Sequence, residues 1–337
     1  MLPPFITDTY KFPVSAVNGN VLHFHRTFHS KSALLPLVAA LLAATAHAET
    51  IISNPETELV QGQNTVQGIQ ISKYQSGQGI KIHDDILYVA PENWTSGDSP
   101  VATTSPVISI IGNAKPIAIT NSTTGSASLV VQGYSLSDAS SSGLITLGEL
   151  GDTPSKGKLE LSQGDLTVRD SSSTSNIVSI QGAGNNSSNP VGAELKAQNI
   201  HLSNLEADDS LIFVQGSERY TSNNNLISEF NQSAILNVTN NDNSSIFDVQ
   251  NTIADSAITA HTGVSVEIDR IRLKGNTFRD AGISIGRDDN IKNNTTYRNH
   301  FEVFDTIFIE DTTVNGIGET GNFEGFALRK TNASIVE

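Results

Sequence analysis

Residues 166–182, with the sequence LTVRDSSSTSNIVSIQG, carry the pattern on which the whole chain is built. Variants of this stretch return four times: YSLSDASSSGLITLGE at 134–149, IHLSNLEADDSLIFVQG at 200–216, LNVTNNDNSSIFDVQN at 236–251 and IRLKGNTFRDAGISIG at 271–286. Each copy reads as an apolar pair, a polar turn and an apolar strand. Repeats of this length indicate an array of stacked units.

The repeat defines two ladders of apolar residues. The first steps by 33 to 37 residues through Ile110, Leu147, Ile180, Val214, Val249 and Ile285. The second steps by 32 to 36 residues through Leu136, Val168, Leu202, Val238, Leu273 and Ile309. A turn former stands two residues after each member of the second ladder, and Asp, Asn and Gly all tolerate the left-handed conformation of a bend. The predicted turn residues are Asp138, Asp170, Asn204, Asn240, Gly275 and Asp311.

Apolar and polar residues alternate within each copy, which is the period of a strand with one buried face. One copy holds about three short strands and buries too few side chains to offset its loss of backbone freedom. Stacked copies share one continuous core. We therefore predict an all-β fold, a right-handed parallel β-helix (β-solenoid) with coils of about 33–37 residues. A β-propeller is the alternative, but it needs about four strands in each blade and its own recurring signature.

Composition narrows the classes of partner and chemistry. The chain has 337 residues and a net charge of −15, and without residues 1–48 it keeps 17 basic and 34 acidic residues. This balance argues against nucleic acid as a partner. The absence of Cys excludes disulfides, thiol catalysis and zinc thiolate sites.

The N-terminal residues read as a targeting segment. A basic flank that ends at Lys31, a short apolar run at 33–45 and the small residues Ala46 and Ala48 predict a signal peptide over 1–48, cut after Ala48. A buried helix is the alternative for the apolar run. We expect an N-terminal cap of the solenoid at 49–106, where the sole Trp94 packs over the end coils, then the β-helix at 107–330 and a truncated end at 331–337.

Few residue groups have the pattern of a catalytic site, and we assign no catalytic, cofactor-binding or metal residue. SGDSP at 96–100 is similar to the nucleophile turn of chymotrypsin-like proteases, but the 16 residues between His83 and Ser99 cannot hold a two-barrel domain. RDDN at 287–290 and IRLK at 271–274 look faintly like polygalacturonase motifs, in the reverse order. Arg272, Arg287, Asp208, Asp209, Asp288 and Asp289 are the charges to place on the coils.

Metal binding has weak support in the sequence. Calcium prefers oxygen ligands such as those at 208–209, 240–243 and 288–289, yet no glycine-rich calcium nonapeptide repeats. The histidines at 83, 201, 261 and 300 match no zinc spacing, so we expect surface or turn roles for them.

The leader, the lack of Cys, the acidic Ser/Asn/Gly-rich composition and coils such as LELSQGDLTVRD (159–170) and AELKAQNIHLSNL (193–205) resemble bacterial autotransporter passenger domains. The resemblance covers roughly residues 49–330. It implies export through the periplasm to the cell surface, with the chain's own C-terminal outer-membrane barrel as a partner. Residues 310–337 lack the strands of such a barrel, so we expect a fragment or a truncated gene.

From this resemblance we expect a surface protein that mediates adhesion or self-association with a host surface or neighbouring cells. A pectin lyase-like polysaccharide-degrading enzyme and an inert stalk are the alternatives. For the fold itself, we predict that Ile180→Asp strongly destabilises the stack and that Ser172→Asp, in the predicted turn, has little effect.

Overall fold

The structure, a computed structural model, describes residues 51–53, 58–59, 65–71, 79–111, 117–138, 140, 142–149, 157–161, 163–182, 192–216, 234–261, 263–286, 300–315, 317–318, 321–322 and 328–330. Backbone contacts divide the chain into the units Met1–Ala48 and Glu49–Glu337, and all described residues belong to the second unit. They form strands and turns, with no helix among them. The predicted all-β class is therefore confirmed.

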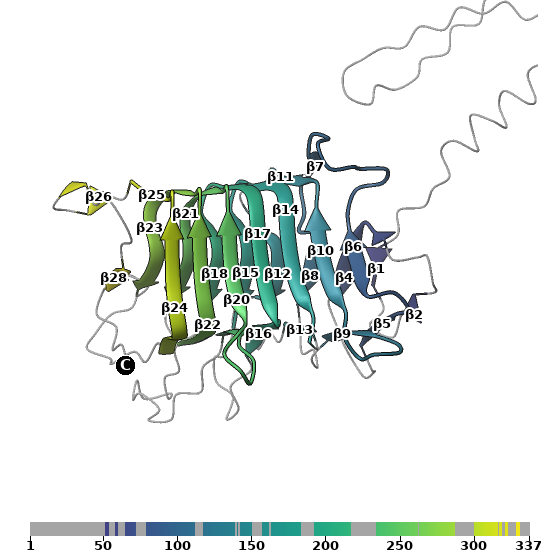
Figure 1. Ribbon diagram of the computed structural model, residues 1–337. Coiled ribbons are helices and arrows are strands. Elements are labelled where there is room, and N and C mark those ends of the chain that lie inside the picture. Colours follow the sequence, from purple (N-terminus) through teal and green to yellow (C-terminus); the bar gives the residue numbers. More distant parts are fainter. Residues whose placement is uncertain are drawn as a thin grey trace, which may run out of the picture. The chain divides into compact units, whose positions relative to one another are not determined.

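The strands stack side by side in parallel, coil upon coil (Figure 1). Each coil contributes strands to three sides of the stack, and a short row of strands crosses one corner. The first side contains β1 (Ile51–Ile52), β4 (Gly68–Ile71), β8 (Ile108–Ile110), β12 (Gly143–Gly148), β15 (Asn176–Gln181), β18 (Ser210–Gln215), β21 (Ile253–His261), β23 (Thr277–Gly286) and β28 (Leu328–Lys330).

The other two sides share the long strands of the last coils. The second side contains β2 (Glu58–Leu59), β5 (Ile80–Ile82), β9 (Ile117–Asn121), β13 (Lys158–Leu161), β16 (Ala193–Lys196), β19 (Ala234–Val238) and the first halves of β22 (Val264–Lys274) and β24 (His300–Glu310). The third side contains β3 (Thr65–Val66), β6 (Ile86–Val89), β10 (Ser128–Gln132), β14 (Asp165–Ser173), β17 (Asn199–Ala207), β20 (Ile246–Gln250) and the second halves of β22 and β24.

The corner row lies between the third side and the first. It contains β7 (Val101–Thr103), β11 (Tyr134–Leu136) and β25 (Thr313–Val314), together with the ends of β14 and β17 and the starts of β21 and β23. A separate antiparallel pair, β26 (Ile317–Gly318) with β27 (Gly321–Asn322), follows it in the chain. This parallel β-helix is the predicted architecture; its right-handed winding stays a prediction.

The core is a set of apolar ladders on the inner faces of the three sides. Alternation places every second residue inside, and the same position on the next coil continues the ladder. On the third side one inner ladder reads Leu129, Leu166, Ile200, Phe247 and Ile271, all fully buried. On the first side Ile180 pairs with Leu147 and Val214, as predicted.

One residue per coil adopts a left-handed conformation at the corner that ends the third side. The predicted turn residues Asp170, Asn204, Gly275 and Asp311 all have φ between +48° and +67°. Gly133 and Asn251 complete the series with φ of +76° and +53°. Asp138 and Asn240, predicted for these two coils, instead fold local turns, in which their side-chain oxygens accept backbone N–H bonds two to four residues on.

The structure corrects the predicted register in one part of the stack. Val249 continues the ladder of Leu202 and Leu273, whereas Val214 pairs with Ala260, and Val238 pairs with Ile268 on the second side. Similarly, Val131 rather than Leu136 precedes Val168. The steps from 202 to 249 and to 273 are 47 and 24 residues. The cause is a separation of eighteen residues between β18 and β19 but only two between β21 and β22.

Two smaller predictions also change. Ser172 lies in strand β14, half-buried and not in a turn, with its hydroxyl bonded to Ser135 at 2.8 Å and Glu206 beside it on the next coil. A new carboxylate there would face a like charge, so Ser172→Asp is no neutral control. In the expected cap region, β4, β5 and β6 already pair in register with the coils that follow.

Candidate functional site

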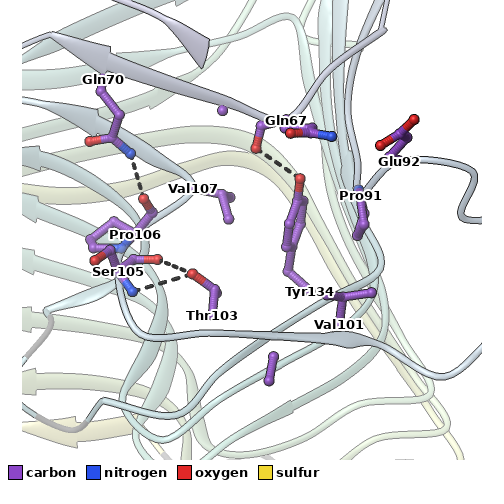
Figure 2. A pocket seen from close by; sticks show the side chains of 12 residues that line it. Gln67, Gln70, Pro91, Glu92, Val101, Thr103, Ser105, Pro106, Val107 and Tyr134 are labelled. Atoms are coloured by element: carbon purple, nitrogen blue, oxygen red, sulfur yellow. Dashed lines mark hydrogen bonds between the residues drawn. The ribbon is translucent and has the colours of Figure 1, made fainter. Parts of the chain in front are cut away.

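A hollow of about 560 Å³ lies beside the corner row, between the turn after β6 and strand β4. Tyr134 stands inside it and donates a hydrogen bond from its hydroxyl to the Gln67 carbonyl oxygen at 2.8 Å (Figure 2). Gln70 Nε2 donates to the Pro106 carbonyl oxygen at 2.6 Å. Both polar groups bind the hollow's own walls, so its lining offers shape and neutral contacts more than charge.

The outer face of the third side carries a second candidate, a row made of His201, Asp248 and Arg272. Strands β17, β20 and β22 place these residues at the same position on three successive coils. Asp248 Oδ2 lies 3.7 Å from His201 Nδ1 and 3.9 Å from an Arg272 guanidinium nitrogen. These separations are those of ion pairs, longer than direct hydrogen bonds. Gln250 Nε2 donates to the same oxygen at 2.7 Å.

The electrostatics of this row fix its charges. Burial alone would raise the pKa of Asp248, but His201, Gln250 and Arg272 outweigh it and hold that pKa below 3.8. The neighbouring Asp248 carboxylate raises the pKa of His201 above 6.5, against the opposing effect of burial. The Asp248 side chain is only 9% exposed, and its Oδ1 has no hydrogen-bond partner. The row thus holds an ionised carboxylate with one oxygen free to accept a bond.

Flanking outward residues also join successive coils. Asn199 Nδ2 donates to Asp165 Oδ1 at 2.8 Å, and Arg169 Nε donates to Gln132 Oε1 at 2.9 Å. At the C-terminal end of the face, Lys274 Nζ lies 3.0 Å from Glu310 Oε1. The third side therefore presents parallel rows of polar side chains that bond along the stack.

Sequence reasoning did not find the row, because its members are 47 and 24 residues apart. It considered His201 and Arg272 separately and did not consider Asp248. The signal becomes readable once the inner ladder is right. Each member directly precedes an inner residue, Leu202, Val249 or Leu273, and so points outward.

The protease-like stretch folds as an exposed turn. Asp98 accepts bonds from the backbone N–H and the hydroxyl of Thr95, which lower its pKa. His83 Nδ1 lies 3.1 Å from the Ser122 hydroxyl, on the next coil. Neither contact joins His83 to the turn around Ser99.

The calcium candidates use their oxygens in local turns. Asp209 Oδ2 accepts a bond from Ser175, and the Asn240 side-chain oxygen accepts backbone N–H bonds from Asp242 and Ser244. In the part of the chain that the structure describes, no group of three or more His, Asp or Glu residues is arranged to hold a metal ion. Residues 287–290, with Arg287, Asp288 and Asp289, lie outside the described residues.

The remaining aromatic and histidine candidates have packing or ion-pair contacts. Trp94 lies against Gly133, where an added Cβ would come within 2.5 Å of the indole ring. His261 meets Phe213 edge-on at 5.2 Å between ring centroids, and His300 Nε2 lies 3.3 Å from Glu302. Trp94 therefore packs on the wall beside the hollow, at the N-terminal end of the coils.

The predicted signal-peptidase residues Ala46 and Ala48 lie outside the described residues. Among the residues that are described, no helix is long and apolar enough to cross a membrane. Neither a protein-family model, nor a curated protein sequence, nor a solved structure matches this chain.

Proposed function

We propose that this chain is an exported, surface-presented β-solenoid that acts without catalysis as a scaffold for adhesion or self-association, like the autotransporter passengers that it resembles. The observation that carries the proposal is the outer face of the third side. Rows of Asp, Asn, Ser, Thr, Gln and basic residues repeat there on every coil at the strand spacing of about 4.8 Å. Many weak contacts in such rows add up through multivalency.

A bead assay tests this role. The purified 337-residue chain is attached to beads, and attachment to one another and to cells is counted. Thr167→Ala and Ser203→Ala together remove two outward hydroxyls from adjacent rows while the inner ladders stay intact. We expect fewer attached beads with this variant. Beads that attach no better than bare beads, with either protein, would favour the inert stalk.

Export needs a separate test. If the leader at 1–48 is a signal peptide, exported material begins at Glu49. Mass spectrometry of the N-terminal peptide from periplasmic or surface material decides the point. Exported protein that retains Met1 would contradict the proposed cleavage after Ala48.

The row of His201, Asp248 and Arg272 supports one second candidate, a polysaccharide-degrading enzyme. An ionised carboxylate beside a histidine and an arginine suits a general base, and its low pKa does not suit a general acid. The test is depolymerisation of a uronate polymer by the wild-type chain and by Asp248→Asn. Activity that disappears in the variant would replace the adhesive role with this one.

A further inference from the structure

Strand β24 forms an open end of the described stack. It pairs along one edge with β22, and no described strand pairs with its other edge. Ile307 and Ile309 continue the inner ladders of Ile271 and Leu273. They are nevertheless 38% and 40% exposed, although the residues that they follow are at most 1% exposed. The core is therefore uncovered at this end (Figure 1).

The N-terminal end of the described stack differs. There the ladder residues Ile52 and Val66 are 3% and 1% exposed, so they are covered. A head-to-tail contact between copies would have to uncover that end. A contact between two C-terminal ends needs no such change, and a two-fold axis closes it after two copies.

The sequence of β24, HFEVFDTIFIE, suits a strand partner. An unpaired edge that is long and apolar favours pairing with another strand. Besides Ile307 and Ile309, the aromatic rings of Phe304 and Phe308 are 45% and 56% exposed. Polar residues that oppose such pairing, such as Lys or Pro, are absent from this strand.

The strand is also complementary to itself. In an antiparallel pair centred on Asp305, Phe301 faces Ile309 and Val303 faces Ile307, so apolar residues from both copies meet. At the two ends, His300 faces Glu310, a pair of opposite charge when the imidazole is protonated. The one unfavourable feature is Asp305, which faces its own copy across the axis.

We propose that two copies of this chain associate through antiparallel pairing of their β24 edges. This deepens the self-association part of the proposed function and rests on it for its biological meaning. The contact is one strand wide, about 35 Å long for eleven residues. It falls short of the roughly 800 Å² per partner of a typical stable interface, so we expect a dissociation constant on the order of micromolar.

Crosslinking tests the register directly, because the chain has no Cys. Asp305→Cys places a single thiol opposite itself across the two-fold axis, where the Cβ separation of paired strands is close to that of a disulfide. We expect mild oxidation to give a covalent dimer. Ile253→Cys is the matched control, since Ile253 is 43% exposed in the body of the stack, and it should stay monomeric.

Analytical ultracentrifugation of the full chain measures the association itself. We expect a dimer that forms with concentration, that Asp305→Asn tightens several-fold and that Ile309→Lys abolishes while circular dichroism stays unchanged. Ile253→Lys should associate like the wild type. If Ile309→Lys does not fold, Ile307→Lys replaces it.

Three results would overturn the proposal: a chain that is monomeric at all concentrations, growth into filaments, and equal crosslinking at positions 305 and 253. A monomer whose β24 edge captures an added apolar strand peptide would assign the edge to a foreign strand. Adhesion of beads carrying the monomeric Ile309→Lys variant would leave the proposed function standing and show that it does not require this dimer.

Discussion

Ile180→Asp tests whether the first side is a closed ladder. Ile180 is fully buried between Leu147 and Val214, so the substitution forfeits roughly 1.5–3 kcal/mol of apolar burial. A carboxyl at this position must take up a proton to stay inside. At pH 7, about three pH units above its ordinary pKa, that costs about 4 kcal/mol. The total of about 6–7 kcal/mol approaches the whole stability of many domains.

The assay is urea unfolding followed by far-UV circular dichroism. Thr174→Asp is the matched control, because Thr174 is exposed in the bend between β14 and β15. Ile180→Val should lose only about 0.5–1.5 kcal/mol. Because the buried carboxyl is neutral at low pH, the Ile180→Asp defect relative to wild type should shrink toward pH 4. Equal unfolding midpoints for Ile180→Asp and Thr174→Asp would refute the ladder.

Three further predictions follow from single contacts. The raised pKa of His201 stabilises the fold below pH 6.5, an effect lost as pH rises through the folded pKa, whereas the lowered pKa of Asp248 stabilises it above pH 3.8; His201→Gln should therefore reduce the loss of urea resistance between pH 5.5 and pH 8.5 in roughly 0.1 M salt, and an unchanged loss would contradict the pair. Gly133→Ala should cost roughly 1–2 kcal/mol in backbone strain and shift the fluorescence of Trp94, while Gly125→Ala, also at positive φ but with nothing near its added Cβ, should leave the fluorescence unchanged. Asn276→Ala leaves the buried Thr252 N–H without its acceptor and should cost about 1–3 kcal/mol in urea unfolding; a cost no larger than that of the exposed Asn315→Ala would show that this bond is dispensable.

The fold was readable from the sequence because inner ladders repeat apolar residues at almost constant spacing. Val168 to Leu202 and Leu273 to Ile309 were placed correctly since those coils have no long insertion. Between Leu202 and Leu273 two coils occupy 71 residues, divided 47 and 24. Even spacing places Val238 at the midpoint, and composition gives no sign that the division is unequal.

The candidate site was not readable for the same reason. Outward residues have no alternation rule that selects among Asp, His and Arg, and they meet only through the coil register. An error of eleven residues in one coil, Val238 in place of Val249, separates Asp248 from His201 and Arg272. The hollow at Tyr134 depends on a contact with Gln67, 67 residues earlier, which no local pattern predicts.

The left-handed corner divides the chain into exchangeable modules. Asp170 and Asn204 occupy the same place on successive coils, so the backbone leaves each of them in the same direction. A gene that loses the codons for residues 171–204 would still encode a chain that passes from one corner to the next strand, with Leu166 then facing Phe247 across the junction. A solenoid of this kind can change its length by whole coils through recombination, and its inner ladders remain continuous.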